Sequence, residues 1–203
     1  MMKRVALVAL VVMGIVSGIQ AQTWKPDKAH STITFSVRHL VITKVSGNFR
    51  DFDGTVTFDG KDFSKGSADF TIQSASIATG QDRRDTHLKS PDFFAVDSFP
   101  TLTFKSTKVT PVDDKHFKLD GNLTIRGTTK PVTFDCTFNG TMDGMGPTRA
   151  SFTATTTINR MDFGVKWDKT LDNGSLVVSK DVDIDLELEL VKAEPGSAPP
   201  TKG

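Results

Sequence analysis

Residues 181–190, DVDIDLELEL, alternate an acidic residue with an aliphatic one at every position. Side chains on a β-strand point alternately to the two faces of a sheet, so this period of two predicts a strand with one charged face and one hydrocarbon face. At about 3.3 Å per residue the segment extends for about 33 Å, which is longer than a typical strand. The charged face suits water, and the hydrocarbon face must pack against protein or against a ligand.

The same period of two recurs over residues 24–191 and predicts eight mostly antiparallel strands separated by turn sequences. A change of register before Ala75 and Ile77 predicts a bulge. Residues 79–100 form the one long irregular stretch, in which DRRDTHL is expected to form a short helix. The apolar residues that mark the successive strands are Ile33, Phe35 and Val37; Val56 and Phe58; Ala68, Phe70 and Ile72; Leu102 and Phe104; Phe117 to Ile125; Val132 to Phe138; Phe152 to Ile158; and Val182 to Leu190.

Eight antiparallel strands with one apolar side each form either two sheets packed face to face or one sheet closed as a barrel. The length of residues 181–190 favours a tall eight-stranded barrel, whose interior is filled by side chains or holds one small ligand. The aromatic residues are 15 Phe, two Trp and no Tyr. Because Tyr normally supplies a polar tip on an apolar body, this set predicts a dry interior.

The alternation places one set of side chains on the inner face, where we expect them to line the lumen and contact a ligand. Two polar residues share this face: His39 follows Phe35 and Val37, and Thr156 follows Phe152. For each, a contact with a ligand head group and a hydrogen bond inside the core fit the pattern equally well. The predicted lumen residues are Phe35, Val37, His39, Phe58, Phe70, Phe104, Leu123, Phe134, Phe138, Phe152, Thr156, Ile184, Leu186 and Leu188.

Residues 83–88, RRDTHL, gather two guanidinium groups, a carboxylate and an imidazole. One interpretation is a polar rim, with Arg84 and His87, that meets a phosphate, quinone or amide head group. The other is that Arg84 and Asp85 pin the loop over one barrel end by hydrogen bonds to the backbone. Arg160, in INRMDFG, offers the same choice. We favour the structural interpretation for both segments and keep Arg84, His87 and Arg160 as possible head-group contacts.

Composition and spacing exclude several classes of function. Lys and Arg total 25 against 24 Asp and Glu, so no field of one sign attracts nucleic acid. Cys136 cannot form a disulfide within the chain, and its alternation with Phe134 predicts a buried core thiol. No His-x-His or Cys pair indicates a metal site. Catalysis needs a nucleophile or an acid–base pair with an orienting partner, which the sequence does not show. We expect no metal, no cofactor and no catalytic residues.

The N-terminus predicts export. A basic start precedes a 12-residue apolar stretch over residues 5–16, and small residues follow up to Ala21. We expect a signal peptide over residues 1–21, cleaved after Ala21, and a periplasmic or secreted protein. The apolar stretch falls short of the ~20 residues that span a bilayer, so we expect no stable membrane anchor. Residues 22–191 then form one domain, and residues 192–203, rich in Pro, Gly and Ser, a disordered tail.

Five motifs in this order resemble the YceI-like family of exported, lipocalin-like proteins: DKAHSTITFSVRHL (27–40), GNFRDFDGTVTFD (47–59), ASIATGQDRRDTHLKSPDFFAVDSFPTLTFKST (75–107), GNLTIRGTTKPVTFD (121–135) and INRMDFGV (158–165). The resemblance implies an all-β fold, an extended eight-stranded antiparallel lipocalin-like barrel with a short helical insertion. It also implies that polyisoprenoids or similar amphiphiles bind in the lumen, with no established catalytic activity. The residues that match family motifs are His30, Ser31, His39, Arg84, Asp85, His87, Leu88, Phe93, Phe94, Arg126, Asn159, Arg160, Asp162, Phe163 and Gly164.

These features together predict an exported binding protein, a monomer or a homodimer, that is not an enzyme. Its ligand is expected to be a polyisoprenoid, a quinone or a fatty-acid-derived amphiphile, held for sequestration, storage or transport. One alternative is an enzyme or redox helper that acts on a bound quinone or prenyl compound, with His39 or His87 as the acid–base group. Another is a structural stress-response protein of the envelope whose lumen is filled by its own side chains.

Overall fold

The computed structural model describes residues 22–59, 63–144, 146–170 and 177–194. The predicted signal peptide, residues 1–21, lies outside the described residues, and so do residues 195–203 of the predicted tail.

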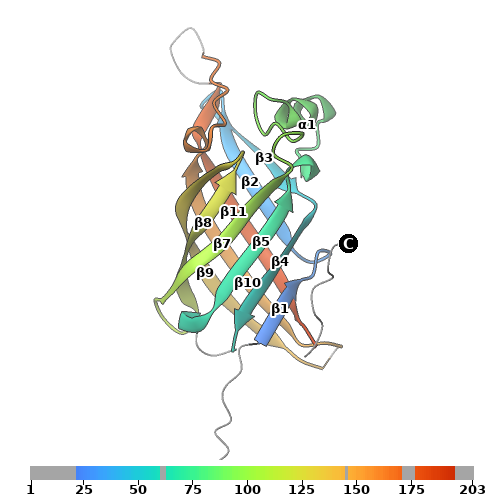
Figure 1. Cartoon of the computed structure of the whole chain (residues 1–203), viewed down its shortest axis with the longest axis vertical. Helices are drawn as coiled ribbons and strands as arrows, with labels where there is room; N and C mark the ends of the chain where they lie inside the picture. Colours follow the sequence, from blue (N-terminus) through green and yellow to red (C-terminus); the bar gives the residue numbers. More distant parts are fainter. Residues whose placement is uncertain (1–21, 60–62, 145, 171–176, 195–203) are drawn as a thin grey trace, which may run out of the picture.

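The strands form one antiparallel sheet that closes on itself as a barrel (Figure 1). Neighbours follow the order β1-β4-β5-β7-β8-β9-β10-β11, and pairing of β11 with β1 completes the ring. This confirms the predicted all-β, eight-stranded antiparallel barrel. The strand segments are β1 (Gln22–Pro26), β2 (Thr32–His39), β3 (Thr43–Phe49), β4 (Phe52–Phe58), β5 (Ser67–Gln73), β6 (Ile77–Ala78), β7 (Thr101–Pro111), β8 (His116–Ile125), β9 (Thr128–Met142), β10 (Arg149–Asn159) and β11 (Val178–Lys192).

Three strands of the barrel are interrupted, which is why more segments are present than the eight predicted strands. β1 and β2 both lie along β11, while β4 pairs with β1 and β3 pairs with β2. β5 and β6 pair in turn with β4 and β3, and the 3-10 turn Ser74–Ser76 separates them where the alternation predicts a bulge. The pattern does not predict β3, because Val45 and Phe49 are its only large apolar residues.

β11 confirms the alternation of residues 181–190. Asp181, Asp183, Asp185 and Glu187 are exposed, and the aliphatic residues between them are more deeply buried, with Leu190 fully buried. β11 pairs with β10 from Asp181 to Val191 and with β2 and β1 on its other side. It continues to Lys192, the first residue of the predicted tail. The long strand is therefore the seam that holds the barrel closed.

The predicted helical insertion is α1 (Asp82–Lys89), which lies over one end of the barrel (Figure 1). The side chain of Gln81 accepts a hydrogen bond from the Arg84 backbone N–H at 2.6 Å and so caps the first turn. Further 3-10 turns span Phe63–Lys65 and Arg160–Phe163. None of the helices in the described part of the chain is long and apolar enough to cross a membrane.

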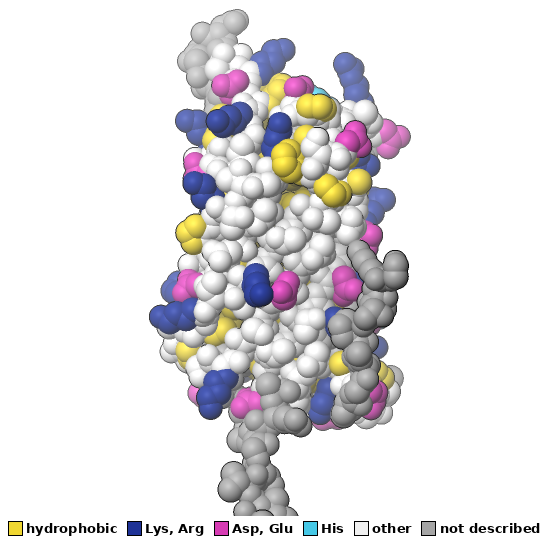
Figure 2. Space-filling model, in the orientation of Figure 1, with side chains coloured by type: hydrophobic (Ala, Val, Ile, Leu, Met, Phe, Trp, Pro, Cys, Tyr) yellow, Lys and Arg dark blue, Asp and Glu magenta, His cyan; other side chains and the backbone are white. Residues whose placement is uncertain are grey.

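Aromatic rings pack the opposite end of the barrel, where β1 lies. Ring centroids are 5.2 Å apart for Trp24 and Phe58, 5.3 Å for Phe58 and Phe152, and 5.1 Å for Phe152 and Phe138. Outside, the face seen in Figure 2 carries scattered charged side chains, and hydrophobic side chains gather toward the end with α1. The two ends of the barrel therefore differ in chemistry.

Candidate functional site: a cavity in the barrel lumen

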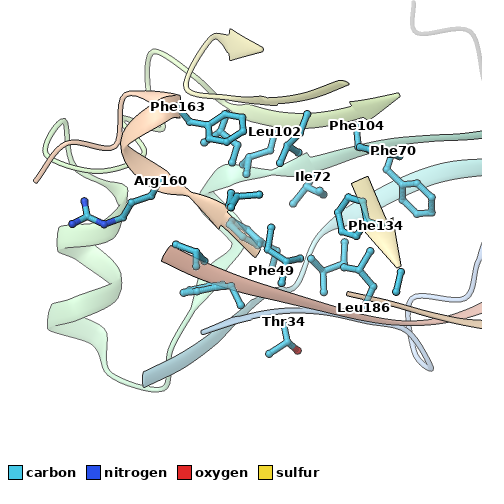
Figure 3. A pocket seen from close by; sticks show the side chains of 18 of the residues that line it. Thr34, Phe49, Phe70, Ile72, Leu102, Phe104, Phe134, Arg160, Phe163 and Leu186 are labelled. Atoms are coloured by element: carbon cyan, nitrogen blue, oxygen red, sulfur yellow. The ribbon is translucent and has the colours of Figure 1, made fainter. Parts of the chain in front are cut away.

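The barrel encloses a cavity of about 760 Å³. This volume lies within the range of about 300–1,000 Å³ that is usual for small-molecule sites. Labelled side chains from separate strands, such as Phe49, Leu102 and Phe134, point toward one another around it (Figure 3). Since the lumen is open, the alternative of a barrel filled by its own side chains is wrong.

The hydrocarbon face of β11 answers the question raised by its sequence. Val182, Ile184, Leu186, Leu188 and Leu190 all line the cavity. Whether they contact a ligand stays a prediction. The predicted lumen residues that line the cavity are Phe35, Val37, His39, Phe58, Phe70, Phe104, Leu123, Phe134, Phe152, Ile184, Leu186 and Leu188.

Two of the predicted lumen residues, Phe138 and Thr156, are not among the lining residues. Phe138 lies beyond the cavity, with its ring centroid 5.9 Å from that of Phe58, in the aromatic packing at the β1 end. The Thr156 hydroxyl donates to the backbone carbonyl of Thr133 at 2.8 Å, so it serves the barrel wall. Alternation fixes the side of the sheet but gives neither height along the barrel nor hydrogen-bond partners. For Thr156 the hydrogen bond fits the structural alternative that the sequence left open, and a ligand contact by either residue stays a prediction.

At two places on the inner face of the barrel, a phenylalanine ring packs directly against a glycine of the neighbouring strand. A Cβ atom at Gly54 would lie 2.5 Å from a ring atom of Phe70, and one at Gly121 would lie 2.3 Å from a ring atom of Phe104. Both distances are shorter than side chains tolerate, so any larger residue at either position would force the facing ring to move. The rings lie flat against the neighbouring strand and leave the centre of the lumen open.

The end of the cavity under α1 is polar, and its loop is fixed by hydrogen bonds. Arg84 donates from Nε to Thr79 Oγ1 at 2.7 Å and from Nη2 to the Thr79 carbonyl at 2.9 Å. The Thr79 backbone N–H donates to Asp85 Oδ1 at 2.9 Å. These bonds confirm that Arg84 and Asp85 pin the loop. Arg84 also lines the cavity, beside Gln81 and Arg83.

His87 lines the same end within an aromatic cluster. Its ring centroid lies 5.0 Å from that of Phe93 and 5.7 Å from that of Trp167, and its Nε2 lies 2.9 Å from Asp92 Oδ2. Phe93 and Trp167 also line the cavity. Both come from loops, and the strand pattern misses them. The family motif picks out Phe93, whereas no feature of the sequence pattern points to Trp167.

Arg160 is a buried pin beside the polar end. Its side chain donates to the carbonyls of Val165 at 2.7 Å, Ser179 at 2.8 Å and Val178 at 3.2 Å, and the residue is 5% exposed. Burial lowers its pKa. Figure 3 shows its guanidinium beside α1, directed away from the aromatic side chains. The favoured structural interpretation is confirmed, and the head-group role stays a prediction.

The titratable groups along the cavity give it a positive bias. None of the described residues that line the cavity is Asp or Glu. Three arginines line it: Arg83, Arg84 and Arg160. Cys136 also lines it as the predicted buried thiol, and burial raises the pKa of this thiol to about 12. The thiol is therefore protonated at neutral pH and is a poor nucleophile.

A cluster of charged residues lies away from this cavity. Asp27, His30 and Glu189 place their donor atoms within 4.8 Å of one another. The Arg149 Nη1 donates to Asp27 Oδ2 at 2.7 Å and also to Glu189 Oε1. Because the guanidinium neutralises these carboxylates, the cluster is an ion-pair network that joins β1, β10 and β11 ends.

Comparisons with known proteins agree with this architecture. A family model described as YceI-like domain matches residues 24–190. A UPF0312 protein of Staphylococcus aureus is 41% identical over 172 residues, which cover 83% of this chain and 96% of the relative. The crystal structure of BcnA from Burkholderia cenocepacia matches with a TM-score of 0.71 at 26% identity, over 81% of this chain and 98% of BcnA. A polyisoprenoid-binding domain from Saccharophagus degradans shares the fold, with a TM-score of 0.65 at 17% identity, over 86% of this chain and 100% of that domain.

Proposed function

This chain belongs to the YceI-like family, and from that membership we propose that it is an exported carrier of a long-chain amphiphile. The ligand lies in the barrel lumen, and the protein sequesters, stores or transports it. The observation that carries this proposal is the 760 Å³ cavity, whose walls are aliphatic side chains and phenylalanine rings. A polyisoprenoid is the ligand class we favour, since a structural neighbour of the same fold is described as binding one.

Exclusion of water drives binding in such a site. Each methylene that moves from water into the lumen contributes about 0.8 kcal/mol, before the loss of ligand freedom is subtracted. Hydrocarbon walls offer few directional contacts, so the length and width of the chain should decide affinity. Quinones and fatty-acid derivatives remain within the proposed ligand class.

The polar end under α1 supports one orientation of the ligand. Arg83 and His87 line it at the surface, and none of the described lining residues is Asp or Glu, while Asp92 outside the lining contacts His87. Arginine presents several donors to phosphate, carboxylate or carbonyl oxygens. We therefore place the head group under α1 and the chain toward the aromatic packing at the β1 end.

Native mass spectrometry tests the proposal directly. The full chain is expressed in bacteria, purified from the periplasm without detergent and measured intact. We expect a ligand-bound mass, and solvent extraction should release a lipid with a long apolar chain. Repeated absence of any such lipid, together with no affinity for added polyprenyl compounds, would contradict the proposal.

Export is part of the proposal and has its own test. Cell fractionation should recover the protein in the periplasm or the medium, and N-terminal sequencing should begin at Gln22. A protein that keeps residues 1–21 and stays in the cytoplasm would contradict export while leaving ligand binding intact.

One observation favours a second candidate, an enzyme or redox helper. His87 lies at the cavity end and its Nε2 is 2.9 Å from a carboxylate oxygen of Asp92. A carboxylate beside an imidazole orients it for proton transfer. The ligand recovered from the His87→Ala protein should be compared with the ligand from the unsubstituted protein. A chemically altered ligand in only one of them favours the enzyme, and an identical ligand favours the carrier.

A further inference from the structure

The tip of the β2–β3 hairpin is apolar and exposed. Leu40, Val41 and Ile42 are 39%, 57% and 81% exposed. In the described ranges, the other exposed large hydrophobic residues are Val112, which follows β7, and Met142, the last residue of β9, both at the opposite end of the barrel. Three consecutive apolar side chains at a loop tip indicate an interaction surface.

The backbone of this tip shows that its side chains are not there to make the turn. Leu40 has φ 51° and Val41 has φ 67°. Left-handed backbone favours Gly, Asn or Asp, and it is particularly unfavourable for a β-branched residue such as Val. A turn of this shape would form more easily with Asn and Gly. The turn itself therefore does not explain the apolar side chains.

Two cations lie directly below the tip. Arg38 and Lys44 are register partners on β2 and β3, and both are exposed. Like charges opposite each other destabilise a hairpin. Lys44 is partly compensated by Asp183, whose carboxylate oxygen lies 3.5 Å from its Nζ. An apolar tip with cations at its base matches the hydrocarbon and the anionic head groups of a bilayer surface.

The tip is continuous with the cavity wall. The Leu40 backbone N–H donates to the Val177 carbonyl at 2.9 Å, and both Val177 and His39 line the cavity. Figure 1 shows β2, β3 and α1 at the same end of the barrel. A chain that left the lumen at this end would emerge beside the apolar tip.

We propose that residues 40–42 insert into the interface of an anionic phospholipid bilayer and hold the α1 end of the cavity against it. Arg38 and Lys44 then lie at the level of the lipid phosphates. That the cavity exchanges its ligand with the membrane there rests on the proposed function. The docking itself does not.

Co-sedimentation with vesicles tests the docking. The probe is vesicles of phosphatidylcholine and phosphatidylglycerol in equal parts, with pure phosphatidylcholine for comparison. Ile42→Asn should lower the partition coefficient about tenfold, since one aliphatic side chain is removed from the bilayer. Val112→Asn is the matched control at the far end and should bind as the unsubstituted protein does. Equal effects of the two substitutions, or no binding by the unsubstituted protein, would overturn the proposal.

A second variant separates docking from folding. Val41→Asn places a residue that tolerates left-handed backbone where Val is strained. We expect its thermal stability to be equal or higher while its vesicle binding falls. Arg38→Gln should weaken binding to the anionic vesicles and leave binding to phosphatidylcholine unchanged. Val41→Asn protein that is stable and still binds fully would show that the tip does not dock.

Two further measurements separate membrane docking from ligand binding in the lumen and from self-association. Binding of a fluorescent lipid in vesicle-free solution should be the same for Ile42→Asn and the unsubstituted protein. The unsubstituted protein could bind vesicles, and lose this binding in Ile42→Asn, while it binds no lipid in its lumen. That result would support membrane docking and contradict the carrier function. If the tip instead mediates self-association, analytical ultracentrifugation shows a dimer that Ile42→Asn dissociates, with no vesicle binding, and the membrane proposal is wrong.

Discussion

Trp24 stacks on Phe58 with ring centroids 5.2 Å apart and 24° between the ring planes. The contact joins β1 to β4 at the end of the barrel opposite α1, and Trp24 is 1% exposed. Within the described part of the chain, its Nε1 has no hydrogen-bond partner. The indole therefore contributes apolar size at this position, and its polar atom carries a desolvation cost.

Trp24→Phe should be nearly neutral, whereas Trp24→Ala should be severe. Phe keeps a stacked ring and removes the unpaired donor, so we expect a change in unfolding free energy within about 1 kcal/mol. Ala leaves a cavity and should cost about 3–5 kcal/mol. Urea unfolding of the two variants measures both values. Equal damage in both would show that Nε1 is engaged.

Ala154→Phe should block the lumen without unfolding the barrel. Ala154 lines the cavity and is 7% exposed, so an added ring can enter empty space. We expect a smaller loss than the about 1–3 kcal/mol of an overpacked core, with clearly weaker binding of a fluorescent lipid. Thr155→Phe, on the outer face of the same strand, is the control and should bind normally. Normal binding by Ala154→Phe would argue against the lumen as the ligand site.

Arg160→Met should destabilise the loop beside the polar end. It leaves the carbonyls of Val165, Val178 and Ser179 without their donor, at about 1–3 kcal/mol for each buried group that finds no other partner. Arg160→Lys should cause a smaller loss of stability than Arg160→Met, because one ammonium group replaces only part of the hydrogen bonding of the planar guanidinium. Thermal unfolding and hydrogen exchange measure the effect. Unchanged stability with lost ligand binding would favour the head-group role.

Cys136 should resist alkylation in the folded protein. Burial raises the pKa of its thiol to about 12, so the reactive thiolate is scarce at about pH 8. We expect iodoacetamide to label it only after denaturant is added, which mass spectrometry detects. Rapid labelling of the native protein would show that the β9 wall opens.

Asp27 should stabilise the fold at neutral pH and lose this effect in acid. Hydrogen bonds from Arg149 first, and from His30 second, lower its pKa in the folded protein. A lowered pKa contributes stability above the unfolded value of about 4 and loses it as pH falls through the folded value. Asp27→Asn should therefore be less stable than the unsubstituted protein at about pH 7, and the difference should shrink below about pH 4.

A companion variant checks this assignment. Arg149→Gln removes the donor that lowers the pKa most, and it should show the same loss at neutral pH. Urea unfolding across the pH range compares the three proteins. A stability difference that grows in acid would contradict the sign of the effect.

Alternation predicted the barrel because backbone geometry alone decides which face a strand residue occupies. Ile184, Leu186 and Leu188 line the cavity for that reason. Alternation did not predict β3, because its inward residues are Val45, Gly47 and Phe49, which include too few large side chains to show a period of two.

Alternation predicted the site only where strands build it, while Arg84 and His87 on α1 were found from the composition of their own segment. Trp167 and Phe93 reach the cavity from loops whose paths depend on long-range packing. Phe138 has the right parity but the wrong height, since no local signal reports where stacked rings end and open space begins. The volume of the lumen likewise depends on how rings lie, which neighbouring strands decide.

The residues at positions 54 and 121, which are glycines beneath Phe70 and Phe104, influence the width of the lumen. A methyl group added at Gly54 would push the Phe70 ring away from the wall. At Gly121 it would displace the Phe104 ring and also meet the Lys105 backbone carbonyl oxygen, 2.8 Å away, so the pairing of β7 with β8 would have to adjust. Homologous barrels with the same strand order could thus differ in lumen width, and so in ligand, through single substitutions at positions that do not line the cavity.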